Sequence, residues 1–221
     1  MLNSKFIFLL ILLPVFSARS QDSLQLDVES KPILSAFAIG VDYGKLAGQF
    51  LDSESKFELG GQLEFKNRII FVSEFGLATL TSNGAYQNTN YTSDGNYFRF
   101  GLGYKIDMSA KNNIYFSLRY ARASFSDRGV IDITSSSGIY NDLEEPFSRD
   151  GLSAQWYEVV VSSETRLWKG LYAGFHVRLR IMDKYDEQQP LDVYTIPGYG
   201  RSFDRTIPAL NLYIKYAIER F

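Results

Sequence analysis

The chain of 221 residues contains no cysteine and a single histidine, His176. The absence of cysteine excludes disulfides, thiolate metal sites and cysteine nucleophiles, and one histidine leaves little for imidazole chemistry. Neither sign of charge is in excess, since 23 Lys and Arg residues face 25 Asp and Glu residues. This balance argues against nucleic acid as a main partner. We therefore expect no cofactor and no transition-metal site.

Long hydrophobic runs are also missing. The longest run, residues 6–16, has about 11 residues, whereas a membrane-spanning helix needs about 20. It follows Lys5 and precedes small residues, which is the pattern of a secretory signal peptide cleaved before Gln21. We therefore expect a signal peptide over residues 1–20, a periplasmic N-terminal segment over 21–32 and a folded domain over 33–221.

The abundant residues are aromatic or small: 15 Tyr, 17 Phe and 17 Gly. Beyond the signal peptide, apolar residues alternate with polar or small ones, which is typical of strands with two different faces. The clearest segment is 97–107, where Phe98 and Phe100 alternate with Arg99 and Gly101. The pattern predicts about eight strands. They cover 33–43, 56–66, 69–79, 97–107, 114–124, 154–166, 171–182 and 208–221.

The connections between these strands alternate between short and long. Residues 67–68, 108–113 and 168–170 are tight turns, whereas 45–55, 80–96, 126–153 and 183–206 are long and rich in polar residues and glycine. Outer-membrane barrels have this asymmetry, with short periplasmic turns, long extracellular loops and both termini in the periplasm. We therefore expect an all-β fold, a single antiparallel up-and-down transmembrane β-barrel behind a cleavable signal peptide.

The two faces of the predicted strands differ in charge. One face carries Phe, Leu, Ile and Tyr, and the other combines charged residues with glycine and alanine, which suits the narrow lumen of a small barrel. Acidic and basic residues balance on the second face, so we expect an internal network of ion pairs. Its members are Asp42, Glu58, Glu64, Glu74, Arg99, Lys105, Arg119, Glu158, Glu164, Arg166, His176, Arg178, Arg180, Lys215 and Glu219.

The last strand, residues 210–221, ends on the aromatic residue Phe221. Together with the signal peptide and the hairpin pattern, it resembles small outer-membrane β-barrel proteins of the OmpX/OmpA-transmembrane type, and most closely outer-membrane barrel families of unknown function. The resemblance implies that Phe221 is an insertion signal read by the barrel-assembly machinery. It also implies contact with outer-membrane lipids and lipopolysaccharide.

The loops 126–153 and 183–206 contain more apolar and aromatic residues than solvated loops need. They either cap the barrel mouth or form a docking surface for another protein. The candidate docking residues are Ile131, Ile133, Tyr140, Phe147, Tyr185, Tyr194, Tyr199 and Phe203.

The function expected from these observations is non-enzymatic. The barrel is interpreted as a structural or accessory protein, a subunit or docking partner in an outer-membrane complex for secretion, uptake or barrel assembly. A narrow channel for ions or small solutes is the alternative, and a lipid- or peptide-modifying enzyme using His176 is the second alternative. The partners expected are other outer-membrane proteins, lipids and the assembly machinery.

Overall fold

The computed structural model describes residues 33–44, 54–83, 89–133, 143–189 and 191–219. The predicted signal peptide, the N-terminal segment 21–32, Tyr140 and Phe221 lie outside the described residues. Residues Lys31–Phe221 form one compact unit. Within the described residues, no helix has the length and hydropathy needed to cross a membrane.

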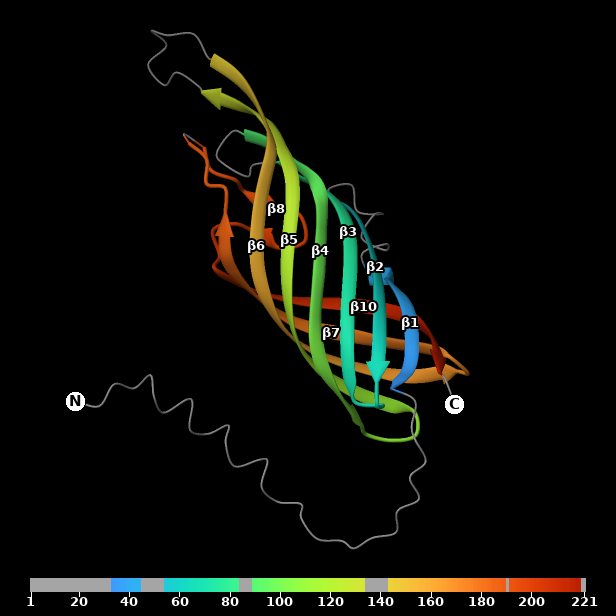
Figure 1. Ribbon diagram of the computed structural model, residues 1–221. Helices are drawn as coiled ribbons and strands as arrows, with labels where there is room; N and C mark the ends of the chain where they lie inside the picture. The colour runs from blue at the N-terminus through green and yellow to red at the C-terminus, as the bar shows by residue number, and fades with distance from the viewer. Residues whose placement is uncertain (1–32, 45–53, 84–88, 134–142, 190, 220–221) are drawn as a thin grey trace, which may run out of the picture. The chain divides into compact units, whose positions relative to one another are not determined.

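Eight antiparallel strands close into a barrel in the order β1-β10-β7-β6-β5-β4-β3-β2 (Figure 1). Each strand pairs with its neighbour in the chain, and β1 closes the barrel against β10. The prediction of an all-β, up-and-down antiparallel barrel is confirmed. The strands are β1 (Leu34–Asp42), β2 (Glu54–Phe65), β3 (Ile69–Asn83), β4 (Thr89–Asp107), β5 (Asn112–Ile133), β6 (Leu143–Trp168), β7 (Leu171–Tyr185) and β10 (Thr206–Glu219). A separate small sheet pairs β8 (Thr195–Ile196) with β9 (Gly200–Arg201).

Tight turns join the strands at one end of the barrel, here called the turn end. Between β2 and β3, Lys66 and Asn67 both have positive φ, at 50° and 57°, and the Arg68 amide donates to the Phe65 carbonyl at 3.1 Å. Two successive left-handed residues make the type I′ geometry that matches the twist of the flanking strands. Between β6 and β7, Gly170 has φ 77°, which a residue without a side chain adopts at little cost.

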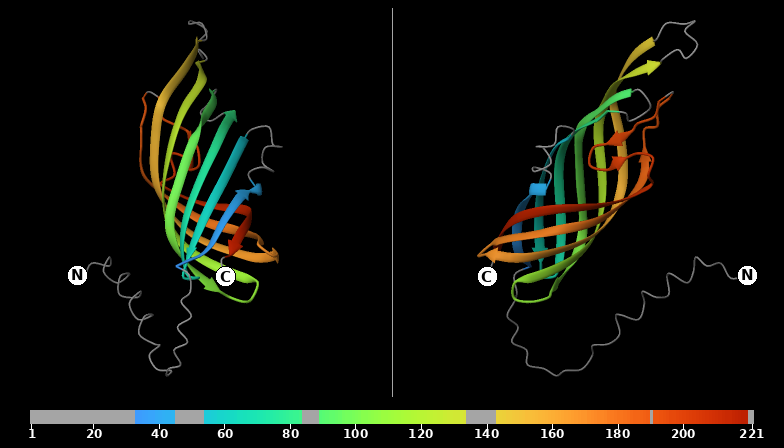
Figure 2. Two further views of the ribbon diagram at one scale, coloured as in Figure 1. Left: turned by 45° about the vertical axis from the view of Figure 1, so that its right-hand side comes forward. Right: turned by 180° about the vertical axis from the view of Figure 1, so that it is seen from behind.

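The strands are longer on one side of the barrel than the sequence predicts. Most of the predicted loops 80–96 and 126–153 is strand, because β4 starts at Thr89, β5 runs to Ile133 and β6 starts at Leu143. These residues pair in register but lack the alternation used to predict strands, since their outer face does not need to be apolar. We call the parts of β4, β5 and β6 at residues 89–96, 123–133 and 143–154 the extended wall. Figures 1 and 2 show it rising beyond β1, β7 and β10.

The outer surface carries a continuous apolar band. On β5 the outward residues between Asn112 and Arg122 are all apolar or aromatic, and Leu118 at the centre is 68% exposed. Ten residue steps at about 3.3 Å, on a strand tilted by about 45°, give a band about 23 Å high. Such a height fits the lipid-facing band of outer-membrane barrels. The inner surface is polar at mid-height and apolar beneath β8 and β9.

Candidate functional site

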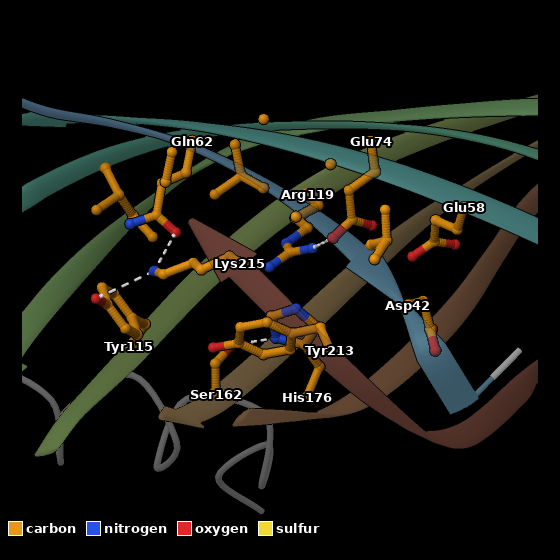
Figure 3. A pocket seen from close by; sticks show the side chains of 17 residues that line it. Asp42, Glu58, Gln62, Glu74, Tyr115, Arg119, Ser162, His176, Tyr213 and Lys215 are labelled. Carbon is orange, nitrogen blue, oxygen red and sulfur yellow. Dashed lines mark hydrogen bonds and ion pairs between the residues drawn. The ribbon is translucent and has the colours of Figure 1, made fainter. Parts of the chain in front are cut away.

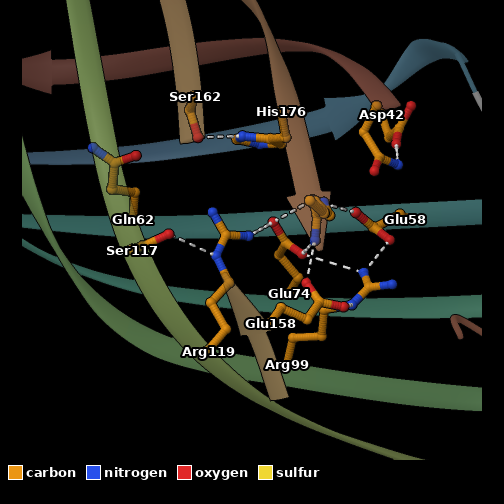
Figure 4. Close-up of polar contacts among 12 residues, drawn as sticks. Asp42, Glu58, Gln62, Glu74, Arg99, Ser117, Arg119, Glu158, Ser162 and His176 are labelled. Atoms are coloured by element: carbon orange, nitrogen blue, oxygen red, sulfur yellow. Dashed lines mark hydrogen bonds and ion pairs between the residues drawn. The ribbon is translucent and has the colours of Figure 1, made fainter. Parts of the chain in front are cut away.

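A cluster of six charged side chains fills the middle of the lumen, and we call it the central cluster. Its residues are Glu58, Glu74, Arg99, Arg119, Glu158 and Arg178, supplied one each by β2 to β7 (Figure 4). All six are at least nine-tenths buried. Register places them together, since Glu74 lies opposite Arg99 and Arg119 opposite Glu158.

Glu74 lies at the centre of this cluster. Its carboxylate accepts from Arg178 at 2.7 and 3.0 Å, from Arg99 at 3.2 Å and from Arg119. A buried guanidinium without a counter-charge costs several kcal/mol. The contacts with Glu74 therefore offset the cost of burying the three arginines. Among the described residues, Arg119 has no other carboxylate partner and donates otherwise to the Ser117 hydroxyl at 3.1 Å.

Glu58 and Glu158 complete the cluster on either side of Arg99. The Arg99 guanidinium is 2.6 Å from Glu58 and 2.8 Å from Glu158. Arg178 reaches the same two carboxylates at 3.4 and 3.1 Å. Three carboxylates thus meet three guanidiniums, so the charges within the cluster balance.

A second network lies nearer the turn end. Glu164 accepts from Lys215 at 2.6 Å, from Tyr115 at 2.5 Å and from Tyr213 at 2.9 Å. Lys105 pairs with Glu64 at 2.9 Å. All of these side chains except Tyr213 line a polar recess of about 500 Å³ at the turn end, whose rim includes residues of the turns themselves.

A smaller cavity of about 50 Å³ lies between the recess and the central cluster (Figure 3). It shares Gln62, Tyr115 and Lys215 with the recess and is lined further inside by Glu74 and Arg119. Its volume suits a few water molecules. The lumen therefore narrows from the turn end and meets the central cluster.

His176 lines this small cavity. Its Nδ1 is 2.6 Å from the Ser162 hydroxyl, and its ring stacks on Tyr213 with centroids 4.2 Å apart. This is the hydrogen-bonding lumen position expected for the only histidine of the chain.

The segment between β7 and β10 folds over the other end of the lumen, and we call residues 186–189 and 191–205 the cap. Its tip is a turn at Pro197-Gly198, in which the Tyr199 amide donates to the Ile196 carbonyl at 3.1 Å and Gly198 has φ 79°. This is a type II turn, which needs glycine at its third position. A Cβ on Gly198 would also lie 2.5 Å from the Tyr97 ring.

Two arginines hold the cap onto the lumen. Arg99 donates to the Gly198 carbonyl at 2.8 Å, and Arg180 donates to the Tyr199 carbonyl at 2.6 Å. The cap residues Val193, Ile196 and Tyr199 are fully buried in an apolar cluster with inward residues of the barrel. Burial raises the pKa of the Tyr199 hydroxyl, which donates to the Asp204 carbonyl at 2.6 Å.

The extended wall supports the cap from one side. Arg149 forms a bidentate pair with Asp127 at 2.7 and 2.5 Å and also donates to the Leu191 carbonyl at 2.5 Å. The Tyr91 hydroxyl donates to Asp127 at 2.9 Å. The Tyr91 ring in turn contacts Tyr194, with centroids 5.9 Å apart. The wall and the cap are therefore one packed body.

The structure places most residues of the predicted lumen network inside the barrel. Asp42 accepts from Asn211 at 2.6 Å, and Arg180 lies 3.8 Å from Glu158 at the margin of the central cluster. Arg166 differs, because it is exposed at the turn end and donates to the Ala110 carbonyl. The side chain of Glu219 lies outside the described residues.

The predicted docking residues divide into four groups. Tyr199 is a correction, because it is fully buried and contributes to the cap. Phe203 is 56% exposed. Ile131, Phe147, Tyr185 and Tyr194 are half-buried, while Tyr140 and the side chain of Ile133 lie outside the described residues. Of the two alternatives left open by the sequence, capping holds for most of the segment after β7.

Sequence reasoning missed the residues that receive the cap. Tyr97 and Trp156 form its floor, and Tyr91, Asp127 and Arg149 hold its side. The available signal was the presence of large aromatics on the otherwise polar face of predicted strands. Among the described residues, no group of three or more His, Cys, Asp or Glu side chains is arranged to hold a metal ion.

A closed eight-stranded barrel with an apolar exterior and a charge-paired interior defines the class of this protein, a β-barrel with the polarity of membrane barrels. The chain belongs to the family described as "Domain of unknown function (DUF6048)", whose model matches residues 1–219. No curated protein matches.

Two solved structures are similar in fold. One is Ail, the attachment invasion locus protein of Yersinia pestis, with 10% identity and a TM-score of 0.44 over 84% of this chain and 98% of that chain. The other is the same protein in complex with the heparin analogue sucrose octasulfate, with 10% identity and a TM-score of 0.42 over 84% and 97%.

Proposed function

We propose that this protein is an integral outer-membrane β-barrel that acts as a non-enzymatic anchor, displaying its cap and extended wall to other outer-membrane proteins. The observation that carries the proposal is the inverted polarity of a sealed barrel. Its outside is apolar over the height of a bilayer core, and its inside is occupied by paired charges.

The apolar band supports a location in the membrane. Exposed leucines at mid-height, such as Leu102 and Leu118 at 63 and 68%, would be unfavourable in water and are favourable against lipid. The turn end then faces the periplasm and the cap faces outward, in keeping with short periplasmic turns. Lipopolysaccharide and other outer-membrane lipids would surround the band, and the barrel-assembly machinery would insert it.

The filled lumen argues against the channel alternative. A barrel of eight strands has an interior just wide enough for its own side chains. Here the central cluster occupies mid-height and the cap covers the far end, so an ion would have to displace both.

The small volume of the cavity around His176 argues against the enzyme alternative. The Ser162–His176 pair lies in a cavity of about 50 Å³, whereas sites for small molecules are typically about 300–1,000 Å³. A lipid or peptide substrate does not fit this space.

What remains for contact with other molecules is the far end of the barrel. The extended wall consists of paired strand residues beyond the apolar band, and its Arg149 braces the cap. Such a braced surface favours an accessory role within an assembly for secretion, uptake or barrel assembly.

The test is co-purification from gently solubilised outer membranes, using a tag placed after Gln21. We expect the protein in the outer-membrane fraction, with another outer-membrane protein retained in fixed stoichiometry. A chain that fractionates with soluble proteins would refute the location. A barrel that purifies alone at every detergent and salt concentration would refute the accessory role, and single-channel recording of that barrel would then test the channel alternative.

A further inference from the structure

The cap carries an exposed segment that is held rigidly. Residues 201–205 follow the Pro197-Gly198 turn and lead into β10. The Ser202 hydroxyl is buried against the carbonyls of Val193 and Tyr194. The Asp204 carbonyl accepts from Tyr199, and the Arg205 carbonyl accepts from the Met182 amide at 2.9 Å. The backbone of this segment is therefore fastened at three points.

The side chain of Ser202 points inward, and the residues on both sides of it point outward. Arg201, Phe203 and Arg205 are all exposed, while Ser202 between them is buried. Among the described residues, neither guanidinium forms an ion pair with a carboxylate. Asp204 is exposed as well, so the segment carries a net charge of one positive unit from two arginines and one aspartate.

Phe203 is backed by further aromatic rings. It contacts Tyr194 edge to face, with centroids 5.7 Å apart, and Tyr194 contacts Tyr91 in the same manner at 5.9 Å. Tyr91 is fully buried and donates to Asp127. A large ring fixed from behind loses little conformational freedom when a partner covers it, which is the property of an interface anchor.

We propose that Arg201, Phe203 and Arg205 form the contact surface through which the cap recognises an acidic patch on a partner protein. Phe203 supplies the buried apolar contact, and the two arginines offer planar, bidentate donors to carboxylates on either side of it. Phenylalanine and arginine are among the residues enriched in protein interfaces relative to the rest of the surface. This proposal rests on the accessory role proposed above and locates it.

The cysteine-free, tagged barrel in native outer membranes provides the test. A photo-reactive phenylalanine analogue at position 203 cross-links the companion in the membrane. Mass spectrometry then identifies the cross-linked peptide, and the sequence of that peptide gives its net charge. We expect an acidic peptide. A neutral or basic cross-linked peptide would overturn the proposal.

Charge variants provide the second measurement. We expect Arg201→Gln with Arg205→Gln to reduce the companion retained per barrel about tenfold, and raised salt to reduce retention by wild type in the same direction. Lys66→Gln with Lys169→Gln removes the same charge from exposed positions at the turn end and should leave retention unchanged. Protection of the cap from protease verifies that each variant is folded.

The two proposals fail differently. Equal retention by wild type and the Arg201/Arg205 variant would overturn the contact surface while leaving the accessory role intact. Absence of any companion from wild type would refute the accessory role and this inference with it.

Discussion

Glu74→Gln tests whether the central cluster holds the barrel together. The substitution keeps the shape of the side chain but removes the carboxylate that Arg99, Arg119 and Arg178 share. Removing one partner of a buried pair costs about 3–5 kcal/mol, because the other charge stays buried without compensation. We expect a loss of about that size in the free energy of unfolding.

Glu64→Gln is the matched control. Its ion-pair partner among the described residues is Lys105, whose side chain remains 16% exposed and also lies 3.4 Å from Asp107. Water and a second carboxylate can therefore compensate Lys105, and we expect a loss of about 1 kcal/mol. The difference between the two variants isolates the cost of an uncompensated buried charge.

A third variant tests the cause of the loss. Because Glu74 is the carboxylate partner of Arg119, adding Arg119→Gln to Glu74→Gln removes the stranded cation. We expect the double variant to be less destabilised than the sum of the single variants. Urea unfolding of the refolded barrel, followed by fluorescence of its two tryptophans, measures all three. Equal losses for Glu74→Gln and Glu64→Gln would refute the reasoning.

Three further outcomes follow from the cap and the band. Gly198→Val should release the cap, because φ 79° is strained for valine and the valine Cβ would meet the Tyr97 ring. Limited proteolysis within the cap measures the release, and unchanged protection from protease would contradict it. Leu118→Arg at the centre of the band should destabilise the barrel in lipid vesicles by about 2–4 kcal/mol, against about 0–1 for Ser124→Arg above it; equal costs would argue against the lipid contact. Deleting residues 187–204 should leave planar bilayers without single-channel conductance, because the central cluster still fills the lumen; open channels from this variant would show that the cap is the only barrier.

The barrel could be predicted from the sequence because lipid and lumen impose opposite requirements on alternate residues. Segment 97–107 shows this, with Phe98 and Phe100 outside and Arg99 inside, as the structure has them. The requirement for an apolar outer face ends above the apolar band. Residues 126–133 and 143–153 are strand for a different reason, since they pair with each other and carry the cap. The alternation of apolar and polar residues therefore does not predict these strand segments.

The composition of the charge network could also be anticipated, but its contacts could not. Period two assigns Glu74 and Arg178 to the lumen, yet these residues lie on strands that are not neighbours in the sheet and meet across the interior. Which acid meets which base depends on register and on strand tilt. The cap contacts depend further on two backbone carbonyls, Gly198 and Tyr199, that no side-chain pattern marks.

The strands have unequal heights, so the cap end of the barrel has a high side and a low side. The extended wall contacts the cap through Tyr91 and Arg149, while β7, β10 and β1, which follow β6 around the barrel, end lower (Figure 2). Phe203, with Arg201 and Arg205, lies directly before β10, one of the lower strands. If the proposed contact surface recognises a membrane-embedded companion, we expect that companion to stand beside the low strands, where it can reach Arg201, Phe203 and Arg205 from the side.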